Sequence, residues 1–230
     1  MTAPVLVEKV HVPIVLGDHI QIPGWVVDLQ TFRRWARSHE YPDHGWFSFL
    51  DGKLWADLSM EQLSSHSQVK TKCTMVLGGL VDEDDLGYFF SDRTLFTNSA
   101  AGLSTEPDGL FASWDAVRHG RVRIVAGAQE GVVEVEGIPD IVLEIVSRNS
   151  VHKDTKVLHD LYWRAGITEY WLVDGRKEKP RFDIYRHTPK GYEPTRRQAG
   201  WLKSTVFRRA FRLSQQKDRL GHPKYTLAVR

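Results

Sequence analysis

The 230-residue chain has little cysteine, since Cys73 is the only one. A lone cysteine can form neither a disulfide within the chain nor a cysteine-rich zinc site, so both are excluded as sources of stability. Cys73 lies in an apolar stretch, where a buried and unreactive thiol is the favoured interpretation. We therefore expect a protein of a reducing compartment.

The chain also lacks a long apolar run. Glu8, Lys9 and Asp18 interrupt the apolar pieces of the first 20 residues. No stretch approaches the roughly 18 apolar residues that a membrane span requires. We expect a soluble, cytoplasmic protein without a membrane partner.

An excess of charge of one sign is lacking too. The 31 Lys and Arg oppose 29 Asp and Glu, and a formal net charge of +2 gives little long-range attraction to a polyanion. Composition therefore neither proves nor excludes a nucleic-acid partner, because local basic patches remain possible. A hydrophobic fraction of 41% with eight tryptophans predicts a packed core, and the length suits one domain.

Three segments are expected along the chain. Residues 1–24 mix prolines with short apolar pieces and show no periodicity, which suggests an N-terminal arm or an edge strand. Residues 25–213 form the domain, and residues 214–230 a C-terminal tail. No internal repeat or low-complexity tract is visible.

The first half of the domain predicts a helix, a hairpin and a second helix. Asp28 can cap an amphipathic helix over LQTFRRWARS. In WFSFLDGKLWADL, Asp51-Gly52 separates two strand-like runs, which is typical of a tight hairpin turn. Residues 64–81 place apolar side chains three and four positions apart, as a helix with one buried stripe requires.

The second half predicts strands and one more helix. GYFFSDRTLFT (87–97), PDGLFAS (107–113) and PDIVLEIVS (139–147) read as strands, with a polar, helix-like insert at 114–124. Apolar spacing predicts a helix over 152–165, and EYWLVD (169–174) reads as a strand. The order is helix, three strands, helix, strand. We expect an α/β (α+β) domain with a mixed sheet flanked by helices, followed by further short strands.

Glu144 is unusual because every neighbour from Ile141 to Val146 is aliphatic. A buried carboxylate is costly unless it is paired, hydrogen-bonded or bound to a metal. The simpler alternatives are an exposed strand face or an arginine partner. The residue type and its surroundings together make Glu144 a candidate site residue.

A second carboxylate is available on a neighbouring strand. Asp140 lies four residues from Glu144, roughly 13 Å along a strand, which is too far for the two to share one ion. Asp108 opens the preceding strand, and paired strands bring opposite residues within roughly 5 Å. Asp108 and Glu144 could then hold one Mg²⁺ or Mn²⁺, since such hard cations take oxygen ligands.

At this point the sequence resembles a known family. PDIVLEIVS, the following KDT, LYWRAGITEYWLVD, the LDGKL hairpin and a helix containing His66 are similar to the Uma-type putative restriction endonuclease family, also called domain of unknown function 820. The resemblance covers roughly residues 25–213, and AGITEYWLVD is its most specific part. The family belongs to the PD-(D/E)XK nuclease superfamily, so the resemblance implies a restriction-endonuclease-like core of order α-β-β-β-α-β, with an N-terminal helix and hairpin.

The resemblance implies a metal-dependent endonuclease that hydrolyses phosphodiester bonds in nucleic acid, with DNA as the expected substrate. Asp108 and Glu144 match the two motif acids that hold Mg²⁺ or Mn²⁺. The superfamily's lysine normally follows two positions after the glutamate, where this chain has Val146. Family members usually carry it on the next helix instead.

The position of the family's helix lysine is Leu158 in this chain, when the alignment runs through Tyr162 and Gly166. The lysines present are Lys153 and Lys156. We expect Lys153 to take the catalytic role, because it lies nearest the start of the helix and its flexible stem could reach a phosphate. Lys156 is the second candidate, and both could equally be solvated helix residues.

Four further residues complete the candidate site. His66 is a metal-ligand candidate and Glu61 the nearby alternative, although a lone histidine is more often structural. Arg121 and Arg123 in the insert could hold backbone phosphates if the insert overhangs the site. A homodimer is one open possibility for the assembly.

Two rival functions remain at this stage. A nuclease-like fold that has lost cleavage could serve as a nucleic-acid or protein binding module, since fold does not guarantee chemistry, and the displaced lysine favours this. Alternatively, the acids could lie on an exposed strand face of a purely structural protein.

Overall fold

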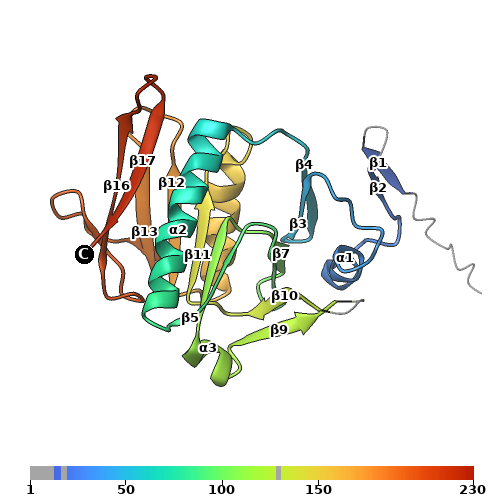
Figure 1. The fold of residues 1–230 in the computed structure, drawn as a ribbon. Helices are drawn as coiled ribbons and strands as arrows, with labels where there is room; N and C mark the ends of the chain where they lie inside the picture. Colours follow the sequence, from blue (N-terminus) through green and yellow to red (C-terminus); the bar gives the residue numbers. More distant parts are fainter. Residues whose placement is uncertain (1–12, 17–19, 128–130) are drawn as a thin grey trace, which may run out of the picture.

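The computed structural model describes residues 13–16, 20–127 and 131–230. Within these residues, one six-stranded sheet carries the expected core, and we call it the central sheet (Figure 1). Its order is β14 (Gly191–Pro194), β13 (Arg181–Thr188), β12 (Glu169–Asp174), β11 (Ile141–Ile145), β8 (Gly109–Ser113) and β5 (Gly87–Ser91). β11 runs parallel to β12 and antiparallel to β8, so the sheet is mixed, as predicted.

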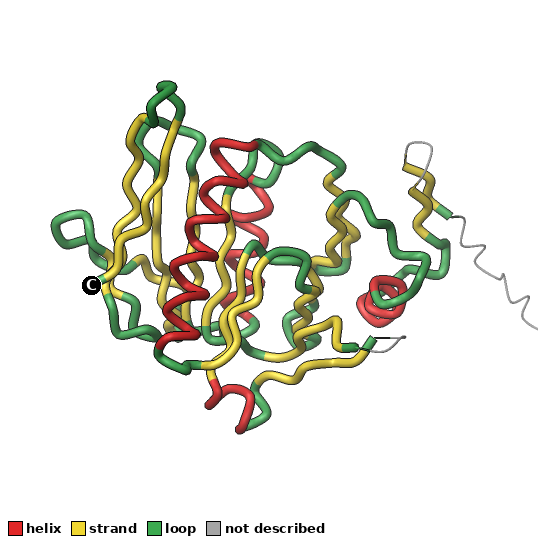
Figure 2. Tube along the Cα trace, viewed as in Figure 1, coloured by secondary structure: helices red, strands yellow, loops and turns green. Residues whose placement is uncertain are grey.

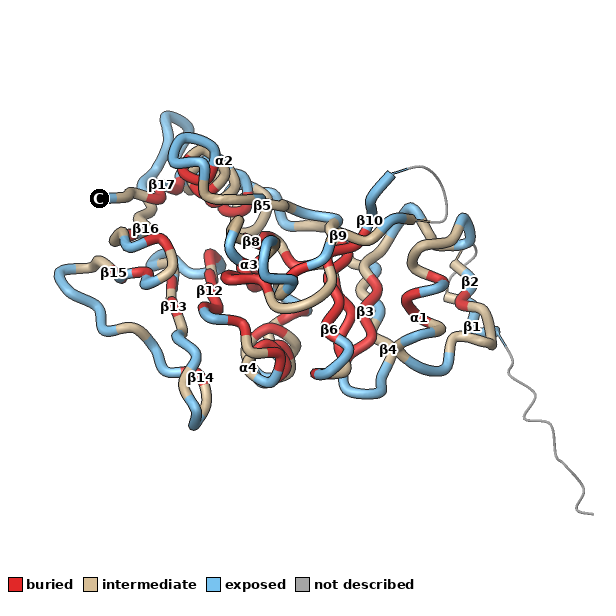
Figure 3. Tube along the Cα trace, turned by 90° about the horizontal axis from the view of Figure 1, so that it is seen from below, coloured by how far each residue is buried: buried red, intermediate tan, exposed pale blue. Residues whose placement is uncertain are grey.

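The predicted order of elements is confirmed. The first core helix consists of η1 (Leu63–Ser67), a π-helical turn, and α2 (Gln68–Glu83). β5, β8 and β11 follow, and then η2 (Lys153–Val157), a second π-helical turn, leads into α4 (Leu158–Arg164) before β12. The two helices cover opposite faces of the central sheet (Figures 2 and 3).

This sandwich explains the apolar run around Glu144. Alternate side chains of a strand point to opposite faces. Ile141, Leu143 and Ile145 pack in the cluster with α2, whereas Val142 packs in the cluster with α4. Both faces of β11 are therefore buried, and Glu144 (3% exposed) points toward the α4 side.

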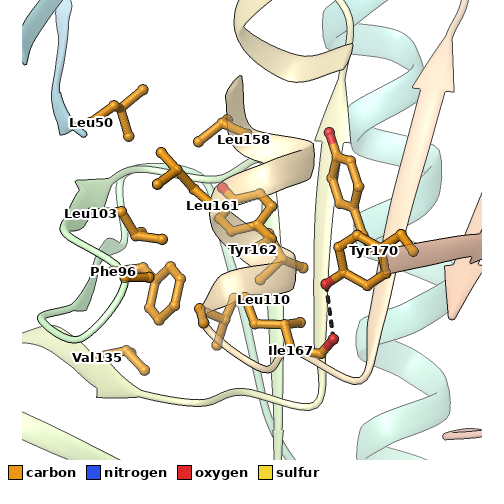
Figure 4. Packing of buried hydrophobic residues seen from close by; sticks show 14 of the residues in the cluster. Leu50, Phe96, Leu103, Leu110, Val135, Leu158, Leu161, Tyr162, Ile167 and Tyr170 are labelled. Atoms are coloured by element: carbon orange, nitrogen blue, oxygen red, sulfur yellow. Dashed lines mark hydrogen bonds between the residues drawn. The ribbon is translucent and has the colours of Figure 1, made fainter. Parts of the chain in front are cut away.

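A second six-stranded sheet packs beside the central sheet. Among the described residues its order is β4 (Lys53–Asp57), β3 (Trp46–Leu50), β7 (Leu103–Thr105), β6 (Leu95–Asn98), β10 (Val132–Gly137) and β9 (Val122–Ala126). One apolar cluster joins the two sheets through α4: Phe96 and Leu103 of the second sheet contact the same core as Leu110 of the central sheet and Tyr162 of α4 (Figure 4).

The local signals for the first elements hold. Asp28 caps α1 (Leu29–Ala36), accepting a hydrogen bond from the Thr31 amide at 2.8 Å. The hairpin between β3 and β4 turns at Asp51 (φ 51°) and Gly52 (φ 76°), both in the left-handed region that the Asp-Gly pair tolerates.

Two expected segments divide between the sheets. The run 87–97 gives β5 and β6, which belong to different sheets because the chain turns between them at Arg93 (φ 61°). The insert 114–124 is a short helix, α3 (Trp114–Arg118), followed by β9, so only its first part is helical. The hydrophobic periodicity of the sequence did not predict that the chain passes from one sheet to the other within these segments.

Among the described residues, parts of the expected N-terminal arm and of the expected C-terminal tail form strands. β1 (Ile14–Leu16) and β2 (Ile20–Ile22) form a hairpin, and Ile22 is buried with residues of α1; the rest of 1–24 lies partly outside the described residues. The expected boundary at residue 213 falls inside β16 (Ala210–Lys217). β15 (Leu202–Lys203), β16 and β17 (Pro223–Val229) form one small sheet, and Tyr225 is buried in the α2 cluster. Residues 214–229 are therefore part of the folded domain.

Glu169 ties this small sheet to the central sheet. Its side chain is fully buried at the start of β12. Its Oε1 accepts hydrogen bonds from the Thr205 amide (2.5 Å) and hydroxyl (2.7 Å). Its Oε2 accepts from Trp171 Nε1 (2.9 Å) and Ser204 Oγ (2.7 Å). A carboxylate suits this place, because both oxygens face only donors.

We predict that Glu169→Gln lowers the free energy of unfolding by about 2 kcal/mol, since the amide NH₂ would face donors and leave them unsatisfied. Urea denaturation followed by tryptophan fluorescence measures this change. Glu193→Gln, at an exposed position on β14, is the matched control and should stay within about 0.5 kcal/mol of the wild type. Equal stability of the two variants would contradict the assigned role of Glu169.

Candidate functional site

Asp108 and Glu144 lie on adjacent strands. Leu143 of β11 pairs with Gly109 of β8, so the antiparallel register continued by one residue places Asp108 opposite Glu144. In place of a ladder bond, Asp108 Oδ2 accepts a hydrogen bond from the Ile145 amide at 2.7 Å. Both carboxylates line one pocket of about 70 Å³ at the end of these strands.

The helix starts form the sides of this pocket. His66 in η1 and Lys70 in α2 line it from one side of the sheet, and Lys153 and Asp154 in η2 from the other. Both contributions come at or beside a π-helical turn, a local widening that is frequent at functional sites. The ends of two central strands and the N-terminal turns of two helices thus meet at the pocket.

The lining is rich in acids. Two lysines and one histidine, Lys70, Lys153 and His66, face six acids: Asp57, Glu61, Glu106, Asp108, Glu144 and Asp154. An excess of carboxylates in a partly buried pocket attracts cations. The pocket is therefore electrostatically suited to a positively charged ion.

Asp108 is held ionised by two cations from the first helix. Its Oδ2 lies 3.5 Å from His66 Nε2, and its Oδ1 lies 3.7 Å from Lys70 Nζ. Burial alone would raise the pKa of Asp108, but the hydrogen bond from His66 and the charges of His66 and Lys70 outweigh it and lower that pKa. Asp108 is thus kept as a carboxylate.

His66 is fixed on both sides. Its Nδ1 contacts Glu61 Oε1 at 2.5 Å, while its Nε2 faces Asp108. Burial lowers the pKa of His66, but the neighbouring carboxylates outweigh burial and raise it, so the imidazolium is favoured. His66 acts in this structure as a cationic partner of Asp108, and its role as a metal ligand stays a prediction.

Lys70 was not recognised from the sequence. Its ammonium group lies 2.5 Å from Glu61 Oε1 and 3.1 Å from Asp92 Oδ2, in addition to its contact with Asp108. The available signal was its spacing from His66, because residues four apart share one face of a helix. Glu106, two residues before Asp108, was missed as well, although it lines the same pocket.

Glu144, opposite Asp108, is buried. Its Oε1 accepts a hydrogen bond from the Tyr162 hydroxyl at 2.6 Å, so Tyr162, a residue of the apolar core, also contacts the site. Burial raises the pKa of Glu144 well above its usual value; Lys153 opposes this shift, and the nearby Asp154 and Asp108 add to it. A cation placed here would relieve the repulsion among these acids.

The two candidate lysines differ in position. Lys153 lines the pocket with 22% of its side-chain surface exposed, and its Nζ lies 3.6 Å from Asp154 Oδ1. Lys156 is exposed and does not line the pocket, and Leu158 is fully buried. The structure therefore brings Lys153, but not Lys156, to the carboxylates.

The arginines of the insert lie elsewhere. Arg121 Nη2 contacts Asp140 Oδ1 at 3.0 Å, and Arg123 Nη2 contacts Glu136 Oε2 at 3.0 Å. Asp140 precedes β11, at the end of the strand opposite to Glu144, roughly 13 Å away. The insert does not overhang the pocket, so the condition on which the proposed phosphate contacts of Arg121 and Arg123 depended is not met.

The residues present fit a hydrated magnesium-type ion better than a fully protein-bound one. In the part of the chain that the structure describes, no three His, Cys, Asp or Glu side chains are grouped closely enough to hold a metal ion by themselves. Mg²⁺ commonly keeps several waters and binds through one or two carboxylates together with substrate phosphates. Asp108 and Glu144 can supply those two carboxylates.

Comparison with known proteins agrees with the geometry. A family model described as Uma2, putative restriction endonuclease, matches residues 29–216. The chain belongs to this family. No curated protein matches it. A crystal structure of a putative nuclease of domain of unknown function 820 from Anabaena variabilis has the same fold, with a TM-score of 0.53 and 19% identity over 70% of this chain and 83% of the other.

The family match and the shared fold confirm the resemblance and the nuclease-like fold predicted from the sequence. Among the described residues no helix is long and apolar enough to cross a membrane.

We predict that Mg²⁺ or Mn²⁺ raises Tm, because an ion that binds only the native state stabilises it. An ion at about ten times its Kd adds about 1.4 kcal/mol, which corresponds to a rise of about 3–6 °C. Differential scanning calorimetry with and without the ion measures the shift.

The Asp108→Ala, Glu144→Ala double variant should lose this shift, whereas a control with two exposed acids replaced, Glu178→Ala with Glu193→Ala, should keep it. An equal shift in the double variant would place the ion at another site. The absence of any shift at millimolar ion would argue against a metal site.

Proposed function

We propose that this family member is a metal-dependent endonuclease that hydrolyses phosphodiester bonds in nucleic acid, with DNA as the first candidate substrate. One observation carries the proposal: Asp108, Glu144 and Lys153 come from three separate segments and line the same small pocket. The membership of the chain in a restriction endonuclease family supports the reaction class.

Each residue has a distinct role in this proposal. Asp108 and Glu144 would hold a divalent ion, which supplies charge neutralisation at the phosphate and lowers the pKa of its bound water. Lys153 would place a positive charge beside the phosphate oxygens, where negative charge develops during displacement. Although burial lowers the pKa of Lys153, the charges of Asp154, Glu144 and Asp108 outweigh it and keep the ammonium form.

His66 and Lys70 serve the ionisation of Asp108 in this mechanism. Their positive charges favour the carboxylate form of Asp108, which is the form that binds a cation. Tyr162 orients Glu144 by donating its hydroxyl hydrogen bond. Side chains of the protein would thus keep Asp108 ionised and Glu144 oriented, so that the two carboxylates can bind one ion.

The alternative function is a nucleic-acid or protein binding module without cleavage. Two observations favour it: the usual lysine positions hold Val146 and Leu158, which are both buried in the apolar cluster, and Lys70 already places a cation 3.7 Å from Asp108. This alternative requires that Lys153 does not replace the missing lysine.

A cleavage assay separates the two functions. Wild-type protein with Mg²⁺ or Mn²⁺ is expected to cut at least one of four substrates, single- or double-stranded DNA or RNA, and EDTA and Glu144→Ala are expected to abolish the cutting. If no nucleic acid is cut with any divalent ion, the hypothesis of a binding module without cleavage replaces that of an endonuclease.

We predict that Lys153→Met lowers turnover by about 100-fold or more, the usual effect of removing one group that stabilises transition-state charge. The substitution keeps most of the aliphatic stem and removes the charge, so folding and metal affinity should stay near normal. Single-turnover kinetics with saturating protein measures the chemical step.

Lys156→Met is the matched control, since Lys156 lies three residues away on the exposed side of the same turn. Its turnover should equal that of the wild type. Full activity in both variants would show that neither lysine takes part in the reaction.

A further inference from the structure

The pocket that holds Asp108 and Glu144 is too small for a nucleoside. Its volume of about 70 Å³ admits roughly five to seven water-sized probes of about 10–15 Å³ each. Pockets that enclose a whole small-molecule ligand begin at roughly 300 Å³. A hydrated ion and one phosphate group match this volume, so the sugar and the base of a substrate must remain outside.

Besides the buried Ile145, the lining of this pocket includes two large apolar side chains. Met60, in the segment between β4 and η1, lines the pocket and is 91% exposed. Trp46, at the start of β3, also lines it and is half-buried, with the Arg93 guanidinium 5.3 Å from its ring centroid. We call Trp46 and Met60 the apolar rim.

Met60 is one of three exposed apolar side chains next to the pocket. Its neighbours in the same short segment, Leu58 (48%) and Leu63 (77%), are exposed as well. Three exposed apolar side chains within six residues, beside a charged pocket, offer an apolar surface that a ligand can cover. With a divalent ion held by the acids of the pocket, that ion and Lys153 complement a phosphate, and the rim complements an apolar surface next to it.

We propose that the apolar rim binds an unpaired nucleobase beside the phosphate in the pocket, so that the preferred ligand is single-stranded nucleic acid. The inference rests on the proposed function insofar as the pocket takes a backbone phosphate. Within a duplex, the neighbouring base pairs cover both faces of each base. An unpaired base instead offers an open face to an aromatic ring or a thioether.

The charge distribution agrees with this ligand. Duplex binding without base contacts depends on many Lys and Arg contacts to phosphates. Arg121 and Arg123 of the insert, which could have supplied two such contacts, are instead paired with Asp140 and Glu136. Base stacking at the rim therefore has to contribute a larger share of the affinity.

Fluorescence anisotropy with the full chain tests the proposal. The probes are a short fluorescein-labelled single strand of mixed sequence and its matched duplex, both of DNA, in EDTA and again with calcium ions. The single strand should bind at least about tenfold more tightly than the duplex, which corresponds to the contact of one stacked base.

Two variants locate the contact. Met60→Ser should weaken single-strand binding about three- to tenfold and leave duplex binding unchanged. Trp46→Leu should do the same, and thermal melting of both variants checks that they are folded. Met75→Ser is the matched control, because Met75 is likewise exposed (62%) but lies on α2, about 13.5 Å along the helix axis from His66.

The outcomes separate this inference from the proposed hydrolysis. Equal or tighter duplex binding, or single-strand affinity unaffected by both rim variants, would overturn the inference even if the wild type cuts nucleic acid. Rim-dependent single-strand binding by a wild type that never cuts would support the inference and refute the hydrolysis.

Discussion

A carboxylate in a strand that is buried on both faces is the constraint on which the site depends. Glu144 has 3% of its surface exposed, and its strand neighbours pack against a helix on either side. Such a group must find its partners within the protein. Tyr162 from α4 donates a hydrogen bond to it, and Lys153 from η2 adds a positive charge. The site is assembled around this requirement.

Asp108, the carboxylate opposite Glu144, also finds its partners within the protein, but its charged partners come from the helix on the other face of the sheet. Asp108 receives the Ile145 amide from the strand and the charges of His66 and Lys70 from the first helix. Each acid is therefore balanced by a different helix, which makes their surroundings unequal. The pKa of Asp108 is lowered, whereas that of Glu144 is raised. Two acids with pKa values shifted in opposite directions are a frequent mark of a functional site.

The elements of the core and the two acids could be predicted from the sequence, because strand and helix periods and the isolated charge of Glu144 are local signals. Lys70 was missed although it lies four residues from His66, because its contacts with Asp108, Glu61 and Asp92 depend on the fold. The prediction that Arg121 contacts phosphates at the site failed for the same reason. Only the fold shows that its partner Asp140 lies at the end of β11 opposite to Glu144. Glu169, the first residue of EYWLVD, anchors the turn at Ser204 and Thr205, which the strand pattern did not predict because these partners lie about 35 residues away in the sequence.

The two positions at which the resemblance leads us to expect a lysine, Val146 and Leu158, share one apolar environment. Val146 follows Glu144 by two residues and faces the same side of the sheet. It is buried in one cluster with Leu158, to which the resemblance assigns the helix lysine, and with Tyr162. Both positions thus contribute to a single apolar contact between β11 and α4, and a lysine at either would have to be accommodated in that contact. Lys153 avoids this conflict because it lies in η2, before α4 begins. Its side chain reaches the pocket at the ends of the strands, outside the apolar contact between β11 and α4. A positive charge can therefore approach Glu144 without passing through the apolar layer.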